Sequence, residues 1–145
     1  MTGTVYPTSP ETAVDVTFAQ GLVGLAEWRR FSMWQPPAAP LFWLLQLEGQ
    51  LLPGLSLVRP ATVWPDYQVP ISEDDLAALG AASPDDVDVY CTTRVDEGGT
   101  RMTANLLGPI LVNPANGQAV QTVLYDTPYT TNEPVEMPQL LASSR

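Results

Sequence analysis

Apolar and polar residues alternate along much of this chain with the two-residue period of β-strands. The alternation is clearest at residues 87–94, where Val87, Val89 and Cys91 fall on one side of the pattern and mostly polar residues fall on the other. We expect a strand there with one buried face. Residues 42–47 are apolar almost throughout, which predicts a central strand and leaves a buried helix as the alternative. Shorter patterns predict further strands at 14–18, 29–34, 55–58, 100–104, 110–112 and 119–124.

One segment carries a convincing helical signal. Ser72 and Asp75 have the N-cap and N3 spacing of a capping box, with Asp in place of the preferred Glu. The acids at 73–75 also stand where a helix dipole favours negative charge. Leu79 can face a core, and Gly80 is suited to the helix end. The sequence therefore predicts a short helix from 73 to 79.

Two turn signals join predicted strands into hairpins. Asn116-Gly117 separates the strands at 110–112 and 119–124, and residues 96–99 precede the strand at 100–104. Many short strands and one short helix predict an all-β, mainly antiparallel fold, a compact and barrel-like single domain. Closure of the sheet into a barrel would remove its exposed edges.

The chain has 145 residues, enough for one domain with a full core. We expect residues 12–134 to form that domain. Residues 1–11 contain prolines, serines and threonines and are expected to be a flexible tail. From Asp126 onward, prolines and polar residues predict extended chain, ending in a second flexible tail at 135–145.

A sharp bend is predicted within residues 102–113. Gly108 permits backbone angles that other residues resist, and Pro109 fixes its own φ and lacks an N–H donor. Asn113, followed by a proline, marks the next turn. We expect the side-chain amide of Asn105 to satisfy the backbone of the bend, in preference to contacting a partner.

Charge is the unusual feature of the composition. The chain has sixteen acids, six arginines and neither lysine nor histidine, for a net charge of −10. Such a surface repels phosphates, which argues against direct binding to nucleic acid. It attracts a basic protein partner, although a charge that serves only solubility is the alternative. No apolar run approaches the length of a membrane span, and the absence of a signal sequence together with the single cysteine favours the cytoplasm.

The residue types argue against an enzyme. Without histidine the usual general base and catalytic triads cannot be built, and without lysine neither a Schiff base nor a P-loop can form. Cys91 is expected to be an inert residue of the core. A carboxylate pair such as Asp66 with Asp126 is the remaining catalytic alternative. No spacing of acids matches a calcium loop, so we predict no catalytic residue, metal or cofactor.

Binding to a protein is then the favoured role. The candidate partner-binding residues are acids in loops or at the helix start, namely Glu73, Asp74, Asp75, Asp85, Asp86 and Asp88, together with Tyr67 and Tyr129. A further acidic pair lies at 96–97. The alternative for the acids is helix capping or a solvated turn. For the aromatic residues near proline-rich chain, Tyr67, Trp34 and Trp64, the alternative is a place in the core.

Residues 103–113 read Thr-Ala-Asn-Leu-Leu-Gly-Pro-Ile-Leu-Val-Asn and resemble the signature of the flagellar assembly factor FliW family. Further fragments match that family in the right order. They lie at 21–25, 41–46, 64–67, 72–76 and 121–124, with Tyr129 in place of the tyrosine near the end of the family pattern.

The resemblance implies a cytoplasmic regulatory protein with a compact barrel-like β-fold, and we expect it to be monomeric. Members of the family bind flagellin and the RNA-binding translational repressor CsrA, and the two partners compete. When flagellin is scarce, the family protein sequesters CsrA, and flagellin mRNA is translated. The inhibition of CsrA is noncompetitive with respect to RNA.

The sequence departs from the family pattern after Tyr129. Family members usually carry a basic Arg-His pair shortly after this tyrosine, whereas this chain has Thr-Thr-Asn-Glu-Pro at 130–134. The usual basic residue near Asn113 is also missing. These changes bear on the partner surface and leave the expected fold intact. The alternative function is a small acidic β-module that binds another protein or a glycan.

Overall fold

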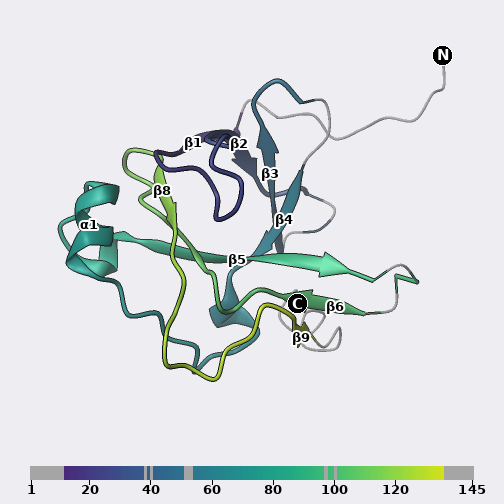
Figure 1. Cartoon of the computed structure of the whole chain (residues 1–145). Coiled ribbons are helices and arrows are strands. Elements are labelled where there is room, and N and C mark those ends of the chain that lie inside the picture. The colour runs from purple at the N-terminus through teal and green to yellow at the C-terminus, as the bar shows by residue number, and fades with distance from the viewer. Residues whose placement is uncertain are drawn as a thin grey trace, which may run out of the picture.

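The computed structural model describes residues 12–37, 39, 41–50, 54–96, 98–99 and 101–135. Within them it is mostly β-structure with one short α-helix, which confirms the predicted fold class (Figure 1). The strands are β1 (Val14–Phe18), β2 (Arg30–Trp34), β3 (Phe42–Leu47), β4 (Leu55–Val58), β5 (Asp88–Val95), β6 (Met102–Ala104), β7 (Ile110–Val112), β8 (Gln118–Gln121) and β9 (Glu133–Val135). The helix is α1 (Glu73–Leu79), and η1 (Pro60–Thr62) and η2 (Pro84–Asp86) are single 3-10 turns.

The sheet closes on itself. Its strand order is β4-β3-β2-β1-β8-β7-β5, and a further pairing of β4 with β5 completes the barrel. The pairing of β1 with β8 is parallel, while the other ladders are antiparallel, in agreement with the mainly antiparallel prediction. β6 and β9 extend from β5 outside the closed ring. Closure leaves the strands of the ring without a long free edge, as the sequence predicted.

One hydrophobic cluster fills the barrel. Phe18 on β1 and Phe31 on β2 pack edge to face with ring centroids 5.4 Å apart. Leu45 and Tyr90 are also fully buried there. Aromatic pairs of this geometry add about 0.5–1.5 kcal/mol beyond the burial of their surface. These side chains hold the two sides of the barrel together.

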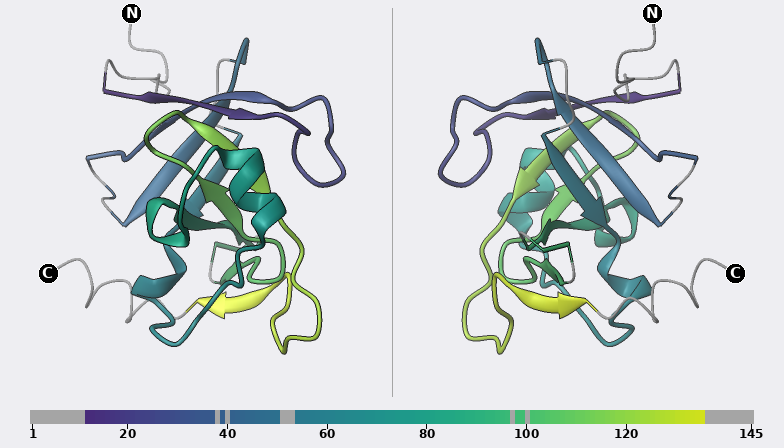
Figure 2. Two further views of the ribbon diagram at one scale, coloured as in Figure 1. Left: turned by 90° about the vertical axis from the view of Figure 1, so that its left-hand side faces the viewer. Right: turned by 90° about the vertical axis from the view of Figure 1, so that its right-hand side faces the viewer.

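Two further clusters cover the outer face of the sheet. Leu79 of α1 packs against Val87 and Leu111, so the helix lies on the barrel at one end (Figure 2). Loops cover Cys91 in the other cluster. The prediction of a single buried face on residues 87–94 was therefore wrong, because Tyr90 points into the barrel while Cys91 points beneath the outer covering.

The short helix follows its sequence signals. Ser72 Oγ accepts a hydrogen bond from the backbone N–H of Asp75 at 3.0 Å, which is the N-cap contact that the spacing predicted. Gly80 ends the helix in the left-handed conformation, with φ of 64°. Both helix ends are thus specified by residues within the segment itself.

The last described residues correct one prediction. Extended chain leading into a tail was expected from Asp126 onward, but Glu133–Val135 forms β9 and pairs with β6, and Val135 is buried. The strand predicted at 119–124 is also shorter, because β8 ends at Gln121. The predicted tail at 1–11 lies outside the described residues, and so does the predicted tail at 135–145 except for Val135, which belongs to β9.

Candidate protein-binding site

Two acidic clusters lie on one side of the barrel. Glu73 and Asp74 are exposed in the first turn of α1, and Asp85 and Asp86 are exposed in η2. Ser83 Oγ accepts the backbone N–H of Asp85 at 3.2 Å, so the turn is capped in the same way as the helix. The alternative role of these acids, at the capped start of a helical turn where the helix dipole favours negative charge, is therefore compatible with the structure. The four carboxylates nevertheless remain open to solvent. This end of the molecule, which we call the acidic end, carries charge that a partner can reach.

The other acids predicted for binding have partners within the chain. Asp88 Oδ1 lies 3.3 Å from Nη2 of Arg59, and both side chains are partly exposed. Asp96 Oδ1 accepts the backbone N–H of Arg101 at 3.2 Å, and Glu97 lies outside the described residues. The pairing with Arg59, which no local pattern indicates, neutralises part of the charge of Asp88. Asp88 is therefore a weaker candidate for docking than the acids of the acidic end.

Tyr67 is buried, with 8% of its surface exposed, so the structure favours its alternative place in the core. Its hydroxyl donates to the carbonyl oxygen of Leu106 at 2.7 Å, and its ring packs edge to face against half-buried Tyr129 with centroids 4.7 Å apart. Burial, reinforced by Cys91, raises the pKa of Tyr67 above its ordinary value. Tyr67 anchors the chain that leads into the bend.

Cys91 and the two tryptophans also belong to the core. Cys91 is fully buried, and burial raises the pKa of its thiol to about 12, an effect that contact with the Tyr67 hydroxyl partly offsets. A protonated, enclosed thiol is unreactive, as the sequence predicted. Trp34 is buried, and Trp64 packs half-buried against the outer cluster around Cys91.

The predicted bend at Gly108 is held by two side-chain amides. Asn105 Oδ1 accepts the N–H of Gly108 at 2.9 Å, which confirms the expected role of Asn105. Gln121 Nε2 donates to the Gly108 carbonyl at 2.9 Å, and its Oε1 accepts the N–H of Val23, also at 2.9 Å. Pro109 is buried beside them. Gln121 thereby joins the bend to the loop at 19–28. This role was not predicted from the sequence, where the only signal for it is a side-chain amide within a predicted strand.

Asn113 is the one buried polar residue among those described, with 4% exposure. Its Nδ2 donates to the carbonyl oxygen of Leu79 at 2.9 Å, and its Oδ1 accepts the N–H of Ala115 at 3.0 Å. Asn116 donates to the same Leu79 oxygen at 3.0 Å. The β7–β8 hairpin is thus tied to the end of α1, and it fixes the position of the helix whose first turn bears the acids.

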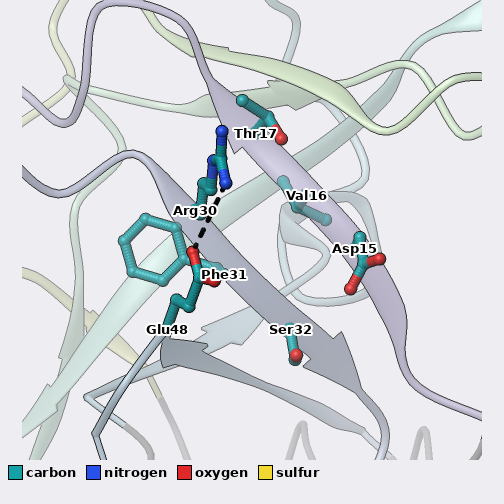
Figure 3. Close-up of a pocket in the computed structure, with 7 residues that line it drawn as sticks. All are labelled: Asp15, Val16, Thr17, Arg30, Phe31, Ser32 and Glu48. Carbon is teal, nitrogen blue, oxygen red and sulfur yellow. Dashed lines mark ion pairs between the residues drawn. The ribbon is translucent and has the colours of Figure 1, made fainter.

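A shallow polar depression of about 410 Å³ lies over β1 and β2 (Figure 3). Asp15 and Thr17 of β1 and Ser32 of β2 line it, and Arg30 faces Glu48 across 4.0 Å at one side. Both charged side chains are largely exposed, so their attraction contributes little stability. The residues that line the depression include no nucleophile paired with a base.

Within the described part of the chain, no three His, Cys, Asp or Glu side chains come close enough together to hold a metal ion. No helix in that part is both long and apolar enough to cross a membrane. The features that remain as a candidate site are the acidic end and the amide-held bend with its neighbouring loop.

Comparison with known proteins gives a consistent result. The sequence profile of a family described as "FliW protein" matches residues 3–135. The chain is 29% identical over 130 residues to a flagellar assembly factor FliW of Treponema denticola, covering 90% of this chain and 87% of the relative. It is 34% identical over 120 residues to a protein of the same description from Symbiobacterium thermophilum, covering 81% of this chain and 86% of the relative.

A solved structure is similar as well. The crystal structure of a flagellar assembly factor FliW superposes with a TM-score of 0.75 and 28% sequence identity, covering 83% of this chain and 84% of that one. The shared region includes the closed barrel. Sequence and fold therefore agree over most of both chains.

Proposed function

The chain belongs to the FliW family of flagellar assembly factors, and from this premise we propose that it binds flagellin and the translational repressor CsrA in turn. Flagellin occupies the protein when it is plentiful, which leaves CsrA free to repress flagellin mRNA. When flagellin is scarce, the protein sequesters CsrA, noncompetitively with respect to RNA, and translation proceeds. The protein acts in this way as a cytoplasmic monomer and carries out no catalysis.

The family match over residues 3–135 carries this proposal. The electrostatics support it, because a repressor that binds RNA must present a basic surface. The net charge of −10 attracts such a surface over a distance, and the exposed carboxylates of Glu73, Asp74, Asp85 and Asp86 give it a place to dock. Attraction over a distance speeds the encounter and does not require that the docked protein covers the surface that holds RNA.

The segment after Tyr129 bears on the surface that meets a partner, whether flagellin or CsrA. The carbonyl oxygen of Thr130 accepts the N–H of Leu106 at 3.0 Å and that of Leu107 at 3.2 Å, so this segment packs against the chain that enters the bend. The side chains of Thr131 and Asn132 are exposed. Neutral residues therefore occupy the surface where the family pattern has a basic pair. We infer that the surface which meets flagellin or CsrA differs here from that of other family members.

The experiment is calorimetric titration of the protein with CsrA from the same organism, repeated after the protein has been saturated with flagellin. The proposal requires that CsrA binds and that flagellin abolishes the binding. Binding of flagellin alone would leave a role in flagellar assembly without the translational one. Binding of neither partner would overturn the proposal and show that the fold serves a different protein.

A further inference from the structure

The barrel has one incomplete seam, beside the end of β8. β1 pairs with Gln118 and Ala119 of β8. After β1 ends at Phe18, the chain leaves the sheet through the loop at 19–28. Beyond this point the β8 chain continues in extended form. Its other side is bonded to the chain before β7, since Thr122 N–H donates to the Pro109 carbonyl at 3.1 Å and Leu124 N–H donates to the Leu107 carbonyl at 2.8 Å.

Backbone geometry determines where the intervening residues point. Successive residues of a strand direct their N–H and C=O groups to opposite sides. Because Thr122 and Leu124 face the β7 side, the backbone groups of Gln121 and Val123 face the seam. Across the described residues, no strand pairs with them on that side. The seam therefore presents backbone donors and acceptors that no strand of the described residues pairs, spaced for one more strand.

Exposed apolar side chains flank this open edge. Val23 and Leu25 lie in the loop on one side, with 57% and 42% of their surfaces exposed. Val123 and Tyr125 follow β8, and Tyr125 is 81% exposed. Both views in Figure 2 place the loop and the chain after β8 on the same side of the barrel. The Gln121 Oε1 contact with the N–H of Val23 holds the loop next to the edge.

A hollow separates the loop from the strand. It has a volume of about 270 Å³ and is lined by residues 20–24 and Ala26 of the loop and by Ala119, Val120 and Gln121 of β8. Val23 lines the hollow beside the open backbone, Val123 and Tyr125 continue along the same edge, and none of these residues belongs to the acidic end. They have the composition of a site for β-strand addition, in which main-chain hydrogen bonds give affinity and alternate side chains give specificity.

We propose that this seam binds an extended segment of a partner protein as an added strand, with apolar residues at alternate positions and Lys or Arg among the others. The extended form follows from the open edge, and the apolar positions follow from Val23, Val123 and Tyr125. The basic residues follow from the net charge of −10. The same charge on a second copy of this chain opposes self-pairing through the seam. The proposal concerns the mode of recognition and stands whether or not the partner is one of those proposed above.

The test begins with a phage-displayed library of random twelve-residue peptides selected against the whole protein. An enriched peptide is synthesised in two forms, one unmodified and one with alternate backbone nitrogens methylated, which keeps side chains and charge but removes the N–H donors. We expect the unmodified peptide to slow hydrogen exchange at the amides of Gln121 and Val123. Methylation on the pairing side should weaken binding at least tenfold.

Two protein variants complete the design. Val123→Pro removes an N–H that faces the seam and pairs with no strand in the described part of the fold, so it should weaken peptide binding at least tenfold. Val95→Ser changes a comparably exposed apolar residue at the end of β5, away from the seam, and should bind as the parent does. Peptides that bind the proline variant and the methylated form undiminished would overturn the proposal. So would protection of amides elsewhere, a selection that enriches nothing over the proline variant, or pairing of two copies of the protein at the seam.

Discussion

The side chain of Asn113 donates a hydrogen bond from Nδ2 to the carbonyl oxygen of Leu79 at 2.9 Å, and this contact joins the β7–β8 hairpin to the last turn of α1. The contact is buried, and Asn113 also accepts the N–H of Ala115. A helix of seven residues has little stability of its own, so its position depends on such tertiary contacts. The acidic end is therefore held in place from the opposite end of the helix.

Asn113→Ala should lower the free energy of unfolding by about 1–3 kcal/mol, because it removes two side-chain hydrogen bonds from a buried position. Asn116→Ala is the matched control, since Asn116 donates to the same Leu79 oxygen but is exposed. Because water can replace the hydrogen bond from Asn116, a smaller loss of unfolding free energy is expected for Asn116→Ala. Urea denaturation of both variants measures the difference. Equal losses would mean that burial of Asn113 contributes nothing beyond the hydrogen bond.

Gly117→Ala should be much more costly than Gly49→Ala. Both glycines have positive φ, at 75° and 86°, so both substitutions strain the backbone by roughly 1–2 kcal/mol. A Cβ at Gly117 would also overlap the carbonyl oxygen of Asp15, whereas a Cβ at Gly49 would meet open space. The overlap should add about 1–3 kcal/mol. Thermal unfolding of the two variants checks this, and similar losses would show that the β1 chain moves aside freely.

The thiol of Cys91 should make the protein less stable in alkali. Its pKa is raised from 9.0 to about 12 in the folded protein, so the folded state holds the proton more tightly than the unfolded state does. The stability linked to this group is complete below pH 9 and falls as the pH rises from 9 towards 12. Tyr67, whose pKa is also raised, contributes with the same sign at higher pH.

Urea denaturation at several values of pH between 8 and 11 should therefore show a decline that is shallower in Cys91→Ala than in the parent. Iodoacetamide at pH 8 should leave Cys91 unlabelled in the folded protein and label it once urea unfolds the chain. Labelling of the folded protein at the rate of a free thiol would contradict the burial of Cys91.

Reversal of Asp85 and Asp86 to lysine should slow association with CsrA by about tenfold at low salt and weaken the dependence of the rate on salt. The matched control reverses Glu27 and Glu48, which line a common surface depression elsewhere and give the same change in net charge. Stopped-flow mixing compares the two variants. If both slow association equally, the net charge rather than the acidic end attracts CsrA.

Local signals in the sequence determine most of the individual elements. The apolar run at Phe42–Leu47 favours a strand, which the structure confirms, and the capping spacing of Ser72 together with Gly80 sets the two ends of α1. The turn at Asn116-Gly117 and the role of Asn105 at the bend have the same kind of origin. These features depend on residues that are neighbours in the chain, so the sequence states them directly. The acids of the candidate site are visible for the same reason.

The tertiary structure alone decided which strands meet. The β4–β5 pairing that closes the barrel and the parallel β1–β8 pairing join segments far apart in the chain, and no local pattern specifies the partner of a strand edge. Closure placed Tyr90 inside the barrel and the outer covering buried Cys91, so a strand with one expected buried face has two. The same long-range packing paired Asp88 with Arg59 and buried Tyr67 against Leu106. It also left the seam beside Val123 open. Each of these outcomes depends on contacts between residues that are distant in the sequence.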